Sequence, residues 1–336
     1  MTNFTDTFER KPIDAVIYWV DGGDPKLSAK REYYLKRTKN VNLQAVRPTF
    51  YVSHNEIKYC VLSILKFAPF VRNIFIVTDE QDPGIHNDIE ANFPGRSKFV
   101  ILVDHKEIFR GFEKYLPVFN STSILSMVWR IKNLSDQFVC FNDDLFLIRE
   151  IKPEDWFVNG RPVLQGKWLL PPYKKMTGNF FKTLMNKYFR GKSDYKPKLS
   201  FYLRQRNAAL MLGFHFRYFF HCHTPHPLNR NVIERYFNEN KELLGKNISY
   251  RFRSPDQFLL TSLAYHLEIL EDNRNIKKLN YGYLHPIYSK RRIEKKIKRC
   301  INDRNIKTVC IQNLDMFEKE ERERIFSWLD NILGIG

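Results

Sequence analysis

Short apolar runs alternate with amphipathic segments along the first half of the chain. The apolar runs are brief and rich in β-branched and aromatic residues, a composition that predicts buried strands. They lie at residues 13–20, 73–79, 98–105 and 137–144. The segments at residues 53–69 and 120–134 carry apolar residues at helical spacing. This alternation predicts an α/β fold with a mainly parallel sheet flanked by helices.

Capping signals predict where the helices begin. Ser53 and Glu56 form an S-x-x-E capping box, so the first of these helices is expected to start there. Asn120 or a neighbouring Ser is the expected N-cap of the second helix. Farther along, Ser254 followed by Pro255 has the signature of a cap and a first helical residue, which predicts a third helix.

Acidic residues follow each of the four predicted strands. Because the carboxyl ends of parallel strands meet at one edge of a sheet, where ligands bind, we expect these acids to form an anionic cleft that binds a cation. The alternative is that the same side chains cap the helices that follow. The acids are Asp21, Asp24, Asp79, Asp104, Asp143 and Asp144.

The stretch QFVCFNDDLFLI places Asn142, Asp143 and Asp144 inside an otherwise apolar segment. Two adjacent carboxylates repel each other, and a divalent cation would neutralise both. We therefore hypothesise that Asp143 and Asp144 bind Mg²⁺ or Mn²⁺. The alternative is a polar turn between two hairpin strands.

Histidines and arginines supply further candidate chemistry. The stretch HCHTPHP crowds His221, His223 and His226 together, but no second Cys/His pair at zinc-finger spacing accompanies it. A general base that accepts a hydroxyl proton is the favoured interpretation. Arg251 and Arg253 precede the predicted cap at residue 254, where guanidinium groups and a helix N-terminus can hold phosphate. Two surface arginines are the alternative.

The chain is strongly basic. Its 55 Lys and Arg against 37 Asp and Glu give a net charge of +18, which favours an anionic partner such as a membrane surface, a phosphorylated substrate or nucleic acid. Nucleic acid is disfavoured because no recognisable nucleic-acid module is present. Basic residues at 290–299 could lie on anionic lipid, although a solvated charged face is the usual explanation for such a run.

Targeting signals and cysteines indicate a compartment. No apolar run reaches the roughly 18 residues that span a bilayer, and the first residues lack the features of a signal peptide. The five cysteines are scattered, which fits free thiols in a reducing compartment. We expect a cytoplasmic protein, peripheral on the inner membrane if it contacts one. We also expect a catalytic domain at residues 1–285, with an insertion or lid at 151–206, and a basic helical extension at 286–336.

Several blocks together resemble one known family. IDAVIYWVDGGDP, NEIKYCVLSILKFAPFVRNIFIVTD, LPVFNSTSI with LSDQFVCFNDDLF, HTPHP and RFRSPD resemble, in this order, the four conserved blocks of the Stealth proteins. That family includes bacterial capsular polysaccharide phosphotransferases and the catalytic part of the lysosomal-enzyme N-acetylglucosamine-1-phosphotransferase. The resemblance covers about residues 13 to 270, with gaps.

The resemblance implies a fold and a reaction. The fold would be similar to a nucleotide-sugar-binding glycosyltransferase A-type domain, with Mg²⁺ or Mn²⁺. The reaction would transfer a sugar 1-phosphate from a UDP-sugar donor to a hydroxyl of a capsular or surface polysaccharide acceptor, with release of UMP. Other capsule-assembly proteins would be further partners. Phosphoryl transfer depends on positioning and charge neutralisation, which suits the metal, cationic side chains and proton acceptor inferred above.

The resemblance also implies roles for single residues. Asp143 and Asp144 would serve the metal and the diphosphate, His223 or His226 would deprotonate the acceptor, and Arg253 would steady phosphate. Nucleotide binding would fall to Asp21, Gly22, Asp24 and Asn142. The chain differs from the family at Leu125, where Glu is usual, and at Leu62, where Arg is usual, which implies an altered pocket.

Two other functions compete with this interpretation. A glycosyltransferase with the same nucleotide-sugar fold would break the other bond of the donor and release UDP. A nucleic-acid-binding or scaffold protein would use the basic surface without any turnover. The nucleotide that is released separates the two enzymes, and salt-sensitive nucleic-acid binding without turnover would indicate the third.

Overall fold

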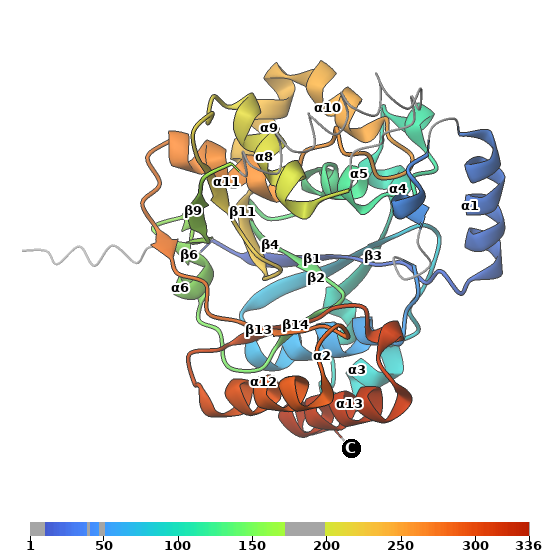
Figure 1. Ribbon diagram of the computed structural model, residues 1–336, viewed down its shortest axis with the longest axis vertical. Helices are drawn as coiled ribbons and strands as arrows, with labels where there is room; N and C mark the ends of the chain where they lie inside the picture. Colours follow the sequence, from blue (N-terminus) through green and yellow to red (C-terminus); the bar gives the residue numbers. More distant parts are fainter. Residues whose placement is uncertain (1–10, 39–40, 47–50, 172–198, 336) are drawn as a thin grey trace, which may run out of the picture.

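The central sheet of the described residues has five strands. The computed structural model describes residues 11–38, 41–46, 51–171 and 199–335. The strand order is β11-β4-β1-β2-β3, in which β1 to β4 are parallel and β11 is antiparallel to β4. The mainly parallel α/β fold is therefore confirmed (Figure 1). The strands are β1 (Ile13–Tyr18), β2 (Val71–Thr78), β3 (Val100–Asp104), β4 (Gln137–Asn142) and β11 (His226–Asn229).

Helices cover both faces of this sheet because side chains of a strand alternate between its faces. In β1, Ile13, Ala15 and Ile17 pack into one apolar cluster and Val16 into another. The first cluster lies under α2 (Glu56–Phe67), α3 (His86–Asn92), α12 (Lys290–Asn302) and α13 (Lys319–Leu333). The second lies under α4 (His105–Ile108), α5 (Ser121–Leu125), α8 (Phe201–Met211), α9 (Arg230–Glu239), α10 (Lys241–Ile248) and α11 (Leu260–Leu270). No described helix is both long and apolar enough to cross a membrane.

One buried carboxylate joins the beginnings of the strands. Asp14 of β1 is fully buried and accepts hydrogen bonds from Arg72 Nε at 3.0 Å and Nη2 at 2.6 Å. It also accepts from the backbone N–H groups of Asn73 and Ser135. A buried charge needs partners for its lone pairs, and these four donors supply them.

The last fifty residues belong to the body of the protein. A second sheet has the order β13-β14-β5, so β14 lies between strands that precede it by more than twenty residues. Its strands are β5 (Leu145–Leu147), β13 (Gly282–Leu284) and β14 (Thr308–Ile311). Tyr59 of α2 donates a hydrogen bond to Asp330 of α13, and its ring stacks on Phe326. The helices expected at 286–336 are present, and their side chains share the main core with those of β14. The division of the chain at residue 286 stays a prediction.

The predicted insertion at 151–206 is only partly within the described residues, because 172–198 lie outside them. The described part packs on the main body through Trp156, Phe157 and Leu164. A lid at this place stays a prediction.

The remaining elements are small. Two are helices, α1 (Pro25–Arg37) and α6 (Pro153–Trp156). Three are pairs of short strands: β6 (Phe157–Val158) with β7 (Arg161–Pro162), β8 (Leu164–Gln165) with β12 (Ile276–Lys277), and β9 (Lys167–Leu169) with β10 (Tyr218–Phe220). The 3₁₀ helices are η1 (Leu43–Val46), η3 (Ser97–Phe99), η4 (Glu113–Tyr115), η5 (Val128–Arg130) and η6 (Leu314–Met316).

Two predictions about helices in the first half of the chain are wrong: the start of α2 and the length of α5. Ser53 is not the cap of α2, because the backbone turns at Asn55, whose φ is 70°, and the helix begins at Glu56. Asn120 does cap α5, accepting from the Thr122 N–H at 3.0 Å, but the helix ends at Leu125. A 3₁₀ turn at Val128–Arg130 follows, and it still delivers the apolar side chains to the core.

The third predicted start is also wrong. The helix expected to be capped by Ser254 and to start at Pro255 begins five residues later, as α11 at Leu260. Gln257 is the physical reason. Its amide oxygen accepts hydrogen bonds from the Ser254 N–H and from Asn120, and its amide nitrogen donates to the Asn247 carbonyl. This buried network holds the chain out of the helical conformation.

Candidate active site

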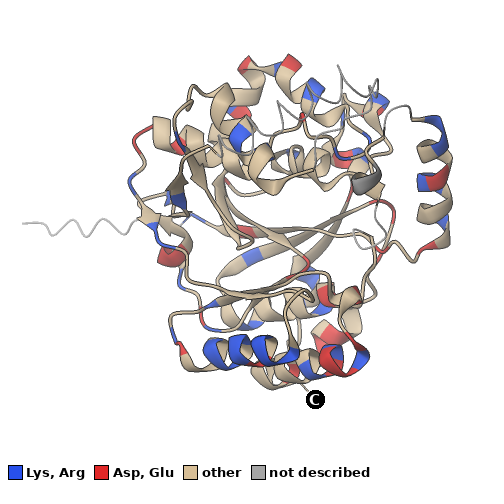
Figure 2. Cartoon of the chain, viewed as in Figure 1, with Lys and Arg blue, Asp and Glu red and all other residues tan. Residues whose placement is uncertain are grey.

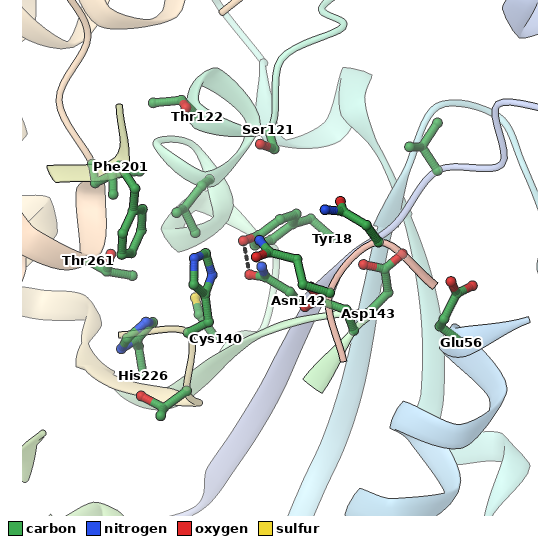
Figure 3. Close-up of a pocket in the computed structure, with 18 of the residues that line it drawn as sticks. Tyr18, Glu56, Ser121, Thr122, Cys140, Asn142, Asp143, Phe201, His226 and Thr261 are labelled. Carbon is green, nitrogen blue, oxygen red and sulfur yellow. Dashed lines mark hydrogen bonds between the residues drawn. The ribbon is translucent and has the colours of Figure 1, made fainter. Parts of the chain in front are cut away.

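A cavity of about 330 Å³ opens at the carboxyl ends of β1 and β4. Figure 3 shows Glu56 and Asp143 on one side of it and Phe201, His226 and Thr261 on the other. The cavity therefore has an acidic side and a side that carries histidine. Its remaining walls include Tyr18, Val20, Ser121, Thr122, Leu125, Cys140, Asn142, Asp144, Arg204, His221, His223, Arg253 and the segment 311–315.

The acidic side carries the two adjacent carboxylates. Asp143 and Asp144 link β4 to β5, and β5 pairs with β14, so no hairpin turn explains them. Burial, and next the charge of Asp144, raise the pKa of Asp143 well above its usual value. Burial raises the pKa of Asp144 to about 7, and Glu56 adds to the rise. One oxygen of Asp144, Oδ1, is buried without a hydrogen-bond partner among the described residues.

These two carboxylates fit a divalent cation. An unpartnered hard oxygen and mutually repelling acids are what Mg²⁺ or Mn²⁺ would satisfy. The described residues contain no group of three or more His, Cys, Asp and Glu that could hold a metal ion. The protein would therefore provide two carboxylates, and water and substrate phosphate would provide the remaining ligands, as is usual for Mg²⁺.

The other predicted acids do not join them, so the expected four-strand anionic cleft is wrong. Asp24 caps α1, accepting from the Lys26 N–H at 2.8 Å, and Asp104 caps α4, accepting from the Lys106 N–H at 2.8 Å. Asp79 forms an ion pair with Lys30 at 2.8 Å. Helix capping, the alternative interpretation, explains Asp24 and Asp104.

The loop after β1 lies beside the cavity, but Asp21, Gly22 and Asp24 are not among the residues that line it. Gly22 is required by packing, because its N–H donates to the Tyr51 carbonyl and a Cβ would collide with Tyr51. Asp21 accepts from the Gly23 N–H at 2.8 Å. These contacts give the loop its shape, and nucleotide binding by its residues stays a prediction.

Asn142 lines the cavity, as expected of a binding residue. Its Oδ1 accepts a hydrogen bond from the Tyr18 hydroxyl (Figure 3). Of the two positions that depart from the family, Leu125 lines the cavity and Leu62 does not. Leu62 is fully buried in the apolar cluster beneath α2, where a charged side chain would have to be paired.

The histidines form a group on the opposite side. The rings of His221 and His226 lie 4.2 Å apart, and His226 Nδ1 is 3.4 Å from the Tyr265 hydroxyl. His223 is less buried and stacks on Phe201 at 4.5 Å. Burial, and then the charges of two neighbouring arginines, lower the pKa of His223 to about 4. Burial lowers the pKa of His226 well below its usual value. Both imidazoles are therefore neutral near pH 7 and able to accept a proton.

Two arginines border the same side. Arg253, which sequence reasoning singled out, donates from Nη2 to the Ser121 hydroxyl at 2.9 Å. Arg204, which it missed, donates from Nη1 to the neighbouring Thr122 hydroxyl. Arg251 instead donates to the Pro117 carbonyl and lies over the Tyr34 ring.

Comparisons with known proteins add to this geometry. The family profile for Stealth protein CR2, conserved region 2, matches residues 50–163. The chain is 32% identical over 262 residues to the receptor polysaccharide phosphotransferase WefC of Streptococcus oralis, covering 72% of this chain and 74% of that protein. It is 38% identical over 153 residues to the capsular polysaccharide phosphotransferase cps1A of Actinobacillus pleuropneumoniae, covering 45% of this chain and 40% of that one.

Solved structures with a similar fold include the galactosyltransferase LgtC in complex with donor and acceptor sugar analogs. The match covers 94% of this chain and 95% of that one, with a TM-score of 0.44 and 11% identity.

Proposed function

The chain belongs to the Stealth family, and from this premise we propose that it transfers a sugar 1-phosphate from a UDP-sugar to a hydroxyl of a capsular or surface polysaccharide. The reaction forms a phosphodiester and releases UMP. WefC and cps1A, the relatives named above, are polysaccharide phosphotransferases. One observation supports the proposal most: a single cavity holds paired carboxylates on one side and neutral histidines with arginines on the other.

The chemistry assigns a task to each side. The acceptor oxygen attacks the phosphorus that carries the sugar, and the bond from that phosphorus to UMP breaks, so that UMP leaves with the electron pair. The hydroxyl proton passes to an imidazole nitrogen of His223, which borders the cavity and is less buried than His226. Asp143 and Asp144 would hold the divalent cation, which neutralises diphosphate charge when bound.

The test is the identity of the released nucleotide. Purified protein is incubated with Mg²⁺ or Mn²⁺, a panel of UDP-sugars and capsule-type oligosaccharides. We expect UMP, together with a phosphodiester in the product. UDP would indicate that the bond to the sugar breaks, and the enzyme would then be a glycosyltransferase.

We also propose that the protein works in the cytoplasm against an anionic membrane surface, which it contacts through α12. Figure 2 shows a row of basic residues along this helix. Its Ile293 and Ile297 are buried in the core, so the apolar stripe of the helix is already used. Only its charged face is left for a membrane, and contact would be electrostatic and sensitive to salt. Binding to other capsule-assembly proteins stays a prediction.

A further inference from the structure

Two arginines from distant segments meet at one wall of the cavity. Arg204 comes from α8 and Arg253 from the loop between α10 and α11. Each donates to one of two consecutive hydroxyl residues, Thr122 and Ser121, so the two guanidinium groups are held next to each other. Both side chains line the cavity.

This arrangement brings two like charges together at a cost. Burial, and next the charge of Arg253, lower the pKa of Arg204 to about 9, which is the direction expected when a cation is desolvated beside another cation. No salt bridge to Arg204 occurs within the part of the chain that the structure describes. Its Nε is buried there without a hydrogen-bond partner.

An anion would remove this cost. A guanidinium group carries five N–H donors, and the bond to Thr122 uses only one nitrogen of Arg204. Forked donors match the oxygens of phosphate, and two guanidinium groups can contact different oxygens of one phosphate group. Asp143 and Asp144 line the acidic side of the same cavity, where a cation is expected instead.

The family resemblance already implies a phosphate contact for Arg253. We propose that Arg204 joins it, that the two arginines together bind a phosphate group of the substrate, and that the Ser121 and Thr122 hydroxyls orient the two guanidinium groups. The proposal deepens the function proposed above and rests on it for the nature of the substrate. The phosphate has two possible sources in a UDP-sugar: the phosphate of the UMP that leaves, or the sugar 1-phosphate that is transferred. Both present the same oxyanion chemistry.

Direct binding tests the proposal and separates the sources. Titration calorimetry at low salt and without metal measures the affinity for UMP and, separately, for N-acetylglucosamine 1-phosphate. We expect Arg204→Gln and Arg253→Gln each to lower the affinity for one of these ligands by about tenfold or more, because hydrogen bonds to charged groups are lost. Weaker UMP binding assigns the site to the nucleotide phosphate, and weaker sugar 1-phosphate binding assigns it to the transferred group.

Controls separate a binding site from a structural arginine. Arg204→Lys keeps the charge but loses the fork, so we expect an intermediate affinity. Arg235→Gln changes an exposed arginine of α9 outside the cavity and should leave both affinities unchanged. Without ligand, the Tm of Arg204→Gln should not fall, because the substitution relieves repulsion with Arg253, and UMP or sugar 1-phosphate should raise the Tm of the wild type more than that of the variant.

The arginine site would be overturned if Arg204→Gln bound both ligands as tightly as the wild type, with or without a lower Tm. This holds whichever nucleotide the transfer assay releases. Release of UDP in that assay would overturn the phosphotransferase reaction and leave the arginine site standing. The two failures are therefore distinguishable.

Discussion

The basicity of His223 depends on what occupies the cavity. After burial, the charges of Arg204 and Arg253 are the main causes of its lowered pKa, and His285 adds a smaller effect. A phosphate group between the arginines and the histidine would offset the first two charges. The base would then gain proton affinity at the time when the substrate is present.

We predict that the pKa of His223 rises when pyrophosphate binds without metal. The imidazolium form gains a favourable interaction with the anion, so the direction is upward from about 4. NMR titration of the ring nitrogens, with assignment from His223→Gln, measures it. In Arg204→Gln the free protein should already show a raised value, and an unchanged pKa after saturation with pyrophosphate would contradict the prediction.

The paired carboxylates give a second prediction at this scale. Asp143→Asn and Asp144→Asn should each lower kcat by at least about a hundredfold, because loss of a metal ligand or of charge neutralisation removes several kcal/mol of transition-state stabilisation. Calorimetry with Mn²⁺ should show weaker binding in both variants. The exposed Asp136→Asn is the control and should keep full activity. Full activity in both cavity variants, with unchanged circular dichroism, would rule out the metal assignment.

The sequence predicts some residues of the cavity and misses others, among them Arg204 and Asp315. Asp143, His223 and Arg253 belong to short polar motifs whose chemistry is readable, and all three line the cavity. Arg204 lies in an ordinary stretch, YLRQRNAAL, where nothing distinguishes it from a surface arginine. Asp315 also lines the cavity, although it follows Asp144 by more than 170 residues, a proximity that only the tertiary fold creates.

At the scale of elements, α11 carries a histidine whose tautomer is fixed by the fold. His266 is fully buried, its Nε2 accepts from the Phe219 N–H at 2.9 Å, and its Nδ1 donates to the Ser262 carbonyl at 2.6 Å. Burial lowers its pKa to about 4. Protonation of Nε2 would remove the bond that ties β10 to α11.

This histidine predicts a pH dependence of stability. Between pH 6.5 and about 4 the unfolded chain binds a proton at this position and the folded chain does not, so the free energy of unfolding falls as the pH falls. The contribution is up to about 1.4 kcal/mol per pH unit. Urea unfolding at several pH values should show a shallower dependence for His266→Gln than for the wild type, whatever its stability at pH 7. The exposed His86→Gln should follow the wild type, and equal slopes for His266→Gln would contradict the prediction.

Elements with their own periodicity are predictable, and their ends are not. The four parallel strands coincide with the predicted apolar runs, because burial within a sheet covered by helices favours such runs. The start of α11 depends on Gln257, whose partners Asn120 and Asn247 are distant in sequence. This network overrides the local capping signal at Ser254, because a buried amide must satisfy its hydrogen bonds.

At the scale of the whole molecule, the role of the α12 charges in membrane binding can be tested by substitution but not by deletion. Deletion of the residues after 290 would also remove β14 and α13, which share the core, so it would test folding. We predict that reversing three exposed charges of the helix weakens binding to phosphatidylglycerol vesicles by about a hundredfold, at about 1 kcal/mol per charge. The changes are Arg291→Glu, Lys295→Glu and Lys298→Glu.

Vesicle sedimentation measures this binding, and added salt should weaken it in the wild type. Lys36→Glu on α1 is compared with each α12 substitution made singly and should have a smaller effect. If the wild type does not sediment with anionic vesicles at low salt, the proposed membrane contact is wrong.

Residues 311–315 form one wall of the cavity, although they come much later in the sequence than the paired carboxylates. During translation, the ribosome makes Asp143 and Asp144 long before it makes this wall, and β14 must pair with β5 and β13 before the wall is in place. A nascent chain that has folded its central sheet therefore exposes the two carboxylates without a pocket around them. The complete site, and with it the proposed transferase activity, would therefore require β14 to be paired with β5 and β13.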